Sequence, residues 1–144
     1  MKFIHCADLH IDSTLESGLS QTNARLRREE LLSSFMRLAA RADELGARAI
    51  IIAGDLFDSE RAGARSRRFV LDTISKYPNV DFLLLTGNHD KGIGDSLTSP
   101  ENLKLFSDTA TAYDYENVRV SGVTEYSDGA FSGVFSPEMI NIFP

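Results

Sequence analysis

The sequence predicts an α/β fold in which parallel strands alternate with helices. Three runs, residues 2–7, 48–53 and 81–86, have the continuous apolar character of strands that are covered on both faces. Two longer segments between these runs repeat apolar residues at helical spacing. The resulting βαβαβ order makes neighbouring strands parallel through right-handed crossovers, and ligands of such sheets gather outside the carboxyl ends of the strands.

The two helices are expected over residues 24–45 and 64–76. Asn23 is the predicted N-cap of the first helix, and Gly46 is its predicted stop. Its apolar stripe comprises Leu31, Phe35, Leu38, Ala42 and Leu45. The second helix ends before Pro78. Its inner face comprises Phe69, Val70, Ile74 and Tyr77.

The pattern is weaker in the last third of the chain. Pro100 fits the first turn of a short helix that ends near Phe106. Residues 111–115 and 118–123 are expected to form two strands around a turn. Residues 134–144 are apolar, and no partner element comes after them. We therefore expect residues 1–144 to form a single domain that is cut before its fold is complete.

Composition narrows the range of functions. The formal net charge of −6 argues against a protein that coats nucleic acid through a basic surface, but carboxylates around bound cations leave a phosphate-cleaving enzyme possible. Cys6 is the only cysteine, so no internal disulfide is possible, and the cytoplasm is the expected compartment. Its position in an apolar run favours a packing role over a nucleophilic one. No signal sequence or membrane-spanning run is expected.

Polar residues follow each of the three predicted strands, where they are costly unless a ligand satisfies them. Asp8 and His10 are one residue apart, so at an extended strand end both side chains point to one side and can bind one cation. Asp55 follows Gly54, which permits a sharp turn and a carboxylate that bridges two metals. Asn88 offers an amide oxygen to the second metal. Together these residues predict a divalent metal site.

His89 is the predicted catalytic residue. Two metals about 3.5–4 Å apart suit in-line phosphoester hydrolysis. An imidazolium at position 89 would stabilise the developing charge or protonate the leaving oxygen. Asp90 or Asp58 could orient this histidine, and Asp58 could equally anchor its own loop. His5 is expected to be a hydrogen-bonded structural histidine.

A group of arginines follows the Asp55 loop. It comprises Arg61, Arg65, Arg67 and Arg68. The group could steer a polyanion toward the metals, or it could be the solvated face of a helix. The sequence slightly favours the solvated face.

Read as DxH, GDxxD and GNHD, the polar clusters resemble the first three motifs of the calcineurin-like metallophosphoesterase superfamily. The flanking residues look most like the branch of DNA double-strand-break repair exonucleases, nuclease subunits that work with coiled-coil ATPases. The resemblance covers about residues 1–125. It implies a β-sandwich flanked by helices, of which this chain supplies the first half, with two divalent metals, usually manganese, and DNA as substrate.

The resemblance also assigns roles to residues. Asp8 and His10 would bind the first metal, Asp55 would bridge, Asn88 would bind the second metal, and His89 would act on the substrate. The family pattern continues with a further histidine and a GHxH motif, whereas this chain has three histidines and none after His89. We therefore expect the amino-terminal part of a longer DNA nuclease, which by itself binds metal weakly and turns over slowly or not at all.

Other interpretations stay open. The same scaffold supports a phosphatase or a nucleotide phosphodiesterase, since the motifs specify phosphoester chemistry and not the attached alcohol. A non-catalytic module could instead dock a partner, such as a coiled-coil ATPase, through its apolar end. An incompletely covered sheet also makes a homodimer plausible.

Overall fold

The computed structural model describes residues 1–14, 18–58, 63–86, 93, 99–124, 129, 131 and 133–143. Its larger sheet has four parallel strands in the order β1-β2-β3-β4. These strands are β1 (Phe3–Cys6), β2 (Ala49–Ala53), β3 (Asp81–Leu85) and β4 (Leu103–Phe106). The expected α/β class and the parallel pairing of the first three strands are confirmed, with strand ends shifted inward by one residue at most positions.

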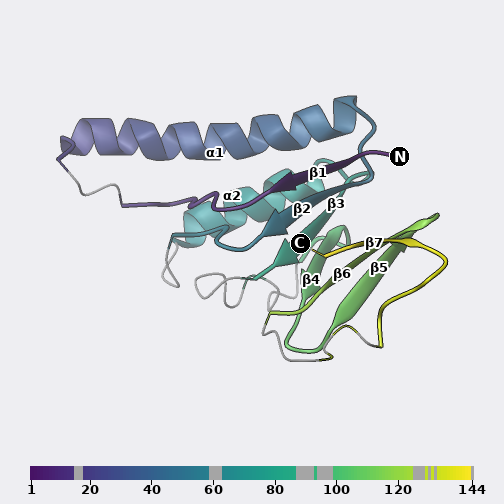
Figure 1. The fold of residues 1–144 in the computed structure, drawn as a ribbon. Helices are drawn as coiled ribbons and strands as arrows, with labels where there is room; N and C mark the ends of the chain where they lie inside the picture. The colour runs from purple at the N-terminus through teal and green to yellow at the C-terminus, as the bar shows by residue number, and fades with distance from the viewer. Residues whose placement is uncertain are drawn as a thin grey trace.

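Two helices and a second sheet cover opposite faces of the parallel sheet (Figure 1). The helices are α1 (Gln21–Glu44) and α2 (Ala64–Ser75). The second sheet has the order β5-β6-β7 and comprises β5 (Thr111–Tyr115), β6 (Val118–Gly122) and β7 (Ile140–Ile142). The arrangement in space is therefore helices, parallel sheet, second sheet.

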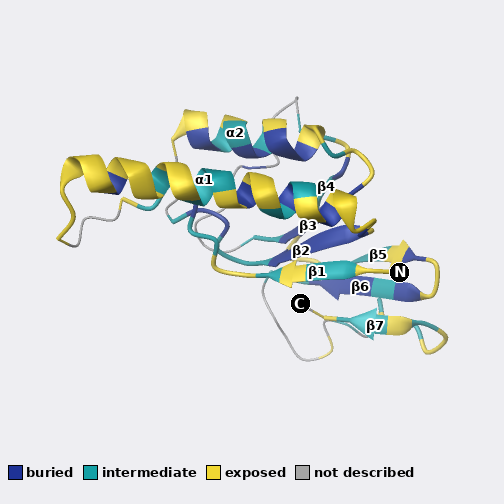
Figure 2. Cartoon of the chain, turned by 90° about the horizontal axis from the view of Figure 1, so that it is seen from above, coloured by how far each residue is buried: buried dark blue, intermediate teal, exposed yellow. Residues whose placement is uncertain are grey.

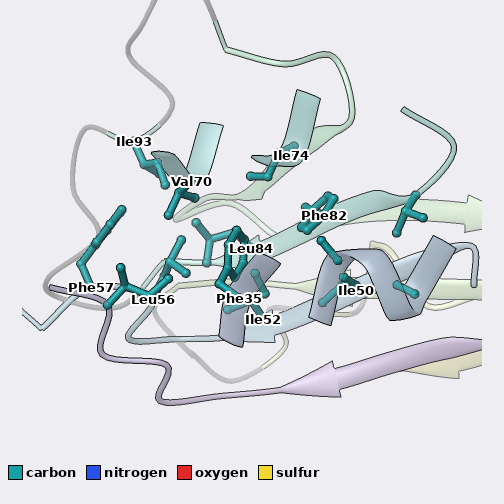
Figure 3. Packing of buried hydrophobic residues seen from close by; sticks show 14 of the residues in the cluster. Phe35, Ile50, Ile52, Leu56, Phe57, Val70, Ile74, Phe82, Leu84 and Ile93 are labelled. Carbon is teal, nitrogen blue, oxygen red and sulfur yellow. The ribbon is translucent and has the colours of Figure 1, made fainter. Parts of the chain in front are cut away.

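The strand β2 shows why its sequence is apolar at every position. Ile50 and Ile52 belong to the core beneath the helices, where Phe35 of α1 and Ile74 of α2 are also buried (Figure 3). Ala49 and Ile51 belong to a second core between the two sheets. Because successive side chains of a strand point to opposite faces, a strand covered on both sides needs apolar residues throughout. Figure 2 shows β2 and β3 as buried strands.

Helix α1 begins earlier than the sequence predicted. The N-cap is Ser20, whose Oγ accepts a hydrogen bond of 3.3 Å from the backbone N–H of Asn23, so the prediction of Asn23 as the cap is wrong. The predicted stop at Gly46 is confirmed by its φ of +63°, which favours glycine. The fully packed positions of the helix are Ala24, Phe35, Ala39 and Ala42, whereas the predicted stripe member Leu45 is 36% exposed.

The predicted short helix after Pro100 is wrong. The Leu103 N–H donates to the Pro100 carbonyl in a turn, and residues from Leu103 onward form β4 beside β3. The Phe82 N–H donates to the Asn102 carbonyl over 2.7 Å, so β4 satisfies the open edge of β3. A strand-edge partner thus outweighed the local signal for a helix.

The apolar carboxyl-terminal stretch has a partner after all. Strand β7 pairs in parallel with β6, opposite the edge on which β5 pairs in the antiparallel sense. The Ile140 N–H also donates to the Asn117 carbonyl. The sequence offered no partner element after this stretch, and the structure pairs it with a strand that precedes it. Among the described residues, no helix combines the length and apolar character needed to cross a bilayer.

A polar cluster links the two sheets near the start of β3. Lys104 Nζ lies 2.6 Å from Asp81 Oδ2, and the Tyr115 hydroxyl donates to the same oxygen over 2.7 Å. The Tyr115 ring also packs edge-on against Phe3 of β1. These contacts lie at the amino ends of the parallel strands, opposite the edge where the polar motifs follow β1 and β2.

Candidate metal centre

Backbone hydrogen bonds join the loops that follow β1 and β2. The His10 N–H donates to the Asp55 carbonyl (3.1 Å), and the Ile11 N–H donates to the Leu56 carbonyl (2.9 Å). Ile11 and Phe57 then form an isolated parallel bridge. Ile11, Leu56 and Phe57 are at most 1% exposed, so they anchor both loops in the core. The candidate ligands are thereby carried by two loops held at fixed register.

The backbone at the candidate ligands is unusual. Asp8, His10 and Asp55 have φ angles of +52°, +44° and +45°, in the left-handed region that few residues other than glycine adopt. Such conformations cost on the order of 1–3 kcal/mol each, and they cluster at functional sites. Since β1 ends at Cys6, the prediction that Asp8 and His10 extend from a strand end is wrong in its geometry. Their side chains converge through left-handed turns instead.

The three side chains meet in one place. Asp8, His10 and Asp55 each offer a ligand atom, and these atoms all lie within 4.8 Å of one another. Asp8 is exposed, and the other two are half-buried. Within the described residues, neither carboxylate forms an ion pair with a lysine or arginine. Two carboxylates beside an imidazole form a donor set that suits a divalent cation such as manganese, iron or zinc.

The third predicted cluster lies outside the described residues. Asn88, His89 and Asp90 belong to it, so the predicted second-metal and catalytic roles stay predictions. The described part of the chain does show that the carboxyl end of β3 lies beside the loop after β2. The Gly54 N–H donates to the Leu85 carbonyl over 2.9 Å, which ties the end of β3 to the loop that bears Asp55.

Asp58 contacts a residue other than those the sequence suggested. Its Oδ1 lies 3.0 Å from Nδ1 of His10, whereas the sequence hypothesis placed Asp58 beside His89 or within its own loop. The His10 Nδ1 atom is buried, and the contact lacks the angle of a formed hydrogen bond. The GDxxD spacing singled out this carboxylate, but nothing in the sequence indicated which histidine it faces.

Asp12 is a structural residue of the site that the sequence analysis missed. Its Oδ2 accepts a hydrogen bond of 2.7 Å from the backbone N–H of Gly63, the N-cap residue of α2. Asp12 also has a left-handed backbone, with φ of +71°. This side chain therefore ties the loop after β1 to the start of α2. The signal available in the sequence was a second acidic residue four positions after Asp8.

The arginines near this edge divide into two kinds. The Arg67 guanidinium lies over the ring of Phe57, 5.2 Å from its centroid, beside the loop that carries Asp55. Arg65 and Arg68 are exposed on α2, and Arg68 lies 3.6 Å from Asp72 one turn along. Arg61 lies outside the described residues. Of the arginines that follow the Asp55 loop, one described residue therefore packs beside the site and two lie on a solvated helix face.

Two side chains of β1 lie apart from the site. Cys6 packs against the helix-side core, and its Sγ is 3.6 Å from the Ile51 carbonyl oxygen. Burial raises the pKa of this thiol to about 11, so the packing role predicted for it agrees with its surroundings. His5 is exposed and makes no side-chain hydrogen bond to another described residue, so its role as a hydrogen-bonded structural histidine stays a prediction.

The sequence matches the calcineurin-like phosphoesterase family over residues 1–140. The chain therefore belongs to this family.

The chain is also similar to individual proteins. The chain is 33% identical over 93 residues to the DNA double-strand break repair protein Mre11 of Archaeoglobus fulgidus, an alignment that covers 63% of this chain and 20% of that protein. It is 23% identical over 137 residues to Mre11 of Sulfolobus acidocaldarius, covering 89% and 34%. It is also 30% identical over 115 residues to the uncharacterized metallophosphoesterase YhaO of Bacillus subtilis, covering 74% and 28%. The chain thus spans between a fifth and a third of these relatives.

Proposed function

We propose that this chain carries the first part of a metal-dependent nuclease centre that hydrolyses phosphodiester bonds in DNA. The observation that carries the proposal is the convergence of Asp8, His10 and Asp55 on one point at the edge of a parallel sheet. Membership of a phosphoesterase family supports hydrolysis of a phosphoester. Several relatives bear the name DNA double-strand break repair protein, which supports DNA as the substrate.

Each side chain has a role in the proposed reaction. Divalent cations, which we propose to be manganese, supply Lewis acidity toward a phosphoryl oxygen when bound. Asp8 and His10 would hold the first cation, Asp55 would be shared between the two cations, and Asn88 would hold the second. His89 donates a proton to the leaving oxygen of the cleaved strand. A cytoplasmic location, a homodimer and a coiled-coil ATPase partner stay predictions.

Metal binding is the first test. Titration of the chain with Mn²⁺, followed by the electron paramagnetic resonance signal of the free ion, is expected to show saturable binding. Asp8→Asn and Asp55→Asn should weaken this binding, because each removes an anionic oxygen from the shared site. Asp43→Asn, a change of the same charge at the exposed end of α1, is the matched control. Equal binding by all four proteins would contradict the metal centre.

Substrate class is the second test. The native protein in Mn²⁺ is compared on oligonucleotides, bis-p-nitrophenyl phosphate and mononucleotides. The nuclease proposal expects a preference for long DNA that weakens as salt is added, because polyanion binding releases counterions. His89→Ala should keep its metal while turnover falls roughly 10²-fold or more. A preference for mononucleotides would point to a phosphatase or nucleotide phosphodiesterase instead.

A further inference from the structure

We propose that Asp58 is a positioning residue for the metal centre, and that it acts through His10. Its carboxylate lies where a small rotation would let it accept the hydrogen on Nδ1 of the His10 ring, which would leave Nε2 as the nitrogen that faces the cation. The inference rests on the proposed function, because it concerns how one ligand of that centre is oriented. The observation behind it is the 3.0 Å separation between Asp58 Oδ1 and His10 Nδ1.

The backbone fixes both partners of this contact. His10 is held by its N–H bond to the Asp55 carbonyl, and the Asp58 N–H donates to the Ile11 carbonyl over 3.3 Å. Ile11 and Phe57, the residues next to the two partners, form the parallel bridge and are buried in the core. The side chains of His10 and Asp58 are 42% and 35% exposed, so they meet at a half-buried position on two pinned loops.

The contact matters because it determines which nitrogen of the His10 ring carries the hydrogen. A neutral imidazole has one N–H and one nitrogen with a free electron pair, and a metal needs the second kind. Metal-binding histidines commonly donate their other ring N–H to a carboxylate, which fixes the tautomer and the ring orientation. The Nδ1 atom of His10 is buried and has no aligned acceptor, and Asp58 is the carboxylate at contact distance. A small rotation of either group completes the hydrogen bond.

Two other roles for Asp58 fit the structure less well. Its carboxylate is not a member of the group of ligand atoms that lie within 4.8 Å of one another, so it is not placed as a further metal ligand. Loop anchoring is already performed by the Asp58 backbone N–H and, nearby, by the side chain of Asp12 on Gly63. The Asp58 side chain is therefore left with His10 as its contact in the described part of the chain.

The tautomer of His10 tests the inference without any metal. Long-range ¹⁵N–¹H correlation spectra of the metal-free chain, recorded on the neutral imidazole, distinguish a hydrogen on Nδ1 from one on Nε2. We expect His10 to carry its hydrogen on Nδ1 in the wild-type chain and to lose this preference in Asp58→Ala. Asp12→Ala, which breaks a loop anchor without touching the ring, should leave the tautomer unchanged. A hydrogen on Nε2 in the wild-type chain would overturn the inference.

Metal affinity is the second readout. Asp58→Ala should lower Mn²⁺ affinity by about 10- to 100-fold, the usual effect of losing a partner that orients a ligand. Asp58→Asn keeps an oxygen that can accept the Nδ1 hydrogen, so it should lose less affinity than Asp58→Ala. Asp72→Asn on α2 removes the same charge at an exposed site and should bind as the wild type does.

The outcomes separate the two proposals. Wild-type Mn²⁺ binding with no loss in Asp58→Ala would reject the role of Asp58 and leave the metal centre intact. Absence of Mn²⁺ binding in the wild-type chain would reject the metal centre, and with it the role of Asp58. Circular dichroism of each variant confirms that a changed affinity does not come from unfolding.

Discussion

The ring of Phe106 on β4 occupies the space that a side chain at Gly122 on β6 would need. A Cβ atom built on Gly122 would lie 2.6 Å from Cγ of this ring, closer than carbon atoms approach in proteins. Phe106 is 2% exposed, so its ring has no free space into which to move. The glycine thus permits the close approach of the second sheet to the parallel sheet.

Gly122→Ala should therefore destabilise the protein. The added methyl group overpacks the core between the sheets, which costs about 1–3 kcal/mol of unfolding free energy in urea denaturation. Gly133→Ala is the matched control, because a Cβ there meets nothing within 4 Å. Adding Phe106→Leu to Gly122→Ala should return part of the loss. A free energy of unfolding equal to that of Gly133→Ala would show that the sheets can separate at no cost.

Ile11→Ala should weaken metal binding as well as stability. Ile11 pins the loop of Asp8 and His10 to the loop of Asp55, and removing its buried side chain costs about 2–5 kcal/mol. Ile74→Ala makes the same chemical change at an equally buried position on α2. Both variants should lose stability in urea, but Ile11→Ala should lose more affinity for Mn²⁺. Equal affinities would mean that the bridge does not hold the ligands.

Asn102→Ala should lower stability without affecting the metal centre. The Asn102 amide donates to the carbonyl oxygens of Ile74, Tyr77 and Val80 at 2.9–3.0 Å, and so joins the end of α2 to the start of β3. The Ile74 and Tyr77 carbonyls keep the backbone N–H groups of Tyr77 and Val80 as donors, so the variant loses the side-chain hydrogen bonds alone, at about 0.5–1.5 kcal/mol each. Asn79→Ala, in the exposed turn nearby, is the control for thermal unfolding. Weaker Mn²⁺ binding by Asn102→Ala would contradict the separation of the two edges of the sheet.

We expect the folded protein to lose stability in alkaline solution because of Tyr115. Burial, and then the hydrogen bond and charge of Asp81, raise the pKa of the Tyr115 hydroxyl far above its ordinary value of about 10. Below pH 10 the hydroxyl is protonated in both the folded and the unfolded chain. Above pH 10 the unfolded chain loses this proton first, so stability falls as the pH rises.

Tyr115→Phe isolates this contribution. The variant should be less stable at pH 8, by about 1.5–3 kcal/mol for a hydrogen bond to a charged acceptor. Its stability should also fall less steeply between pH 10 and 11, as measured by urea denaturation. Tyr77→Phe removes a hydroxyl that makes no hydrogen bond among the described side chains, and serves as the control. Parallel pH profiles for the wild type and Tyr115→Phe would rule out this explanation.

The sequence by itself determined the frame of the fold and the place of the site. Strands covered on both faces, such as β2, can be recognised from the sequence, because a strand between two cores is apolar at successive positions. Parallel strands joined by helices bring their carboxyl ends to one edge, so Asp8 and Asp55 could be expected to meet. Both predictions depend on local pattern and on the rules of chain connection.

Tertiary structure decided what depends on a distant partner. Strand β4 formed where the sequence favoured a helix, because the open edge of β3 needed hydrogen bonds. The left-handed turn at His10 lies where its N–H bonds to the Asp55 carbonyl in the loop after β2, about 45 residues along the chain. The contact of Asp58 with His10 arises in the same way, since it is the register of two loops, and not their composition, that chooses which histidine a carboxylate faces.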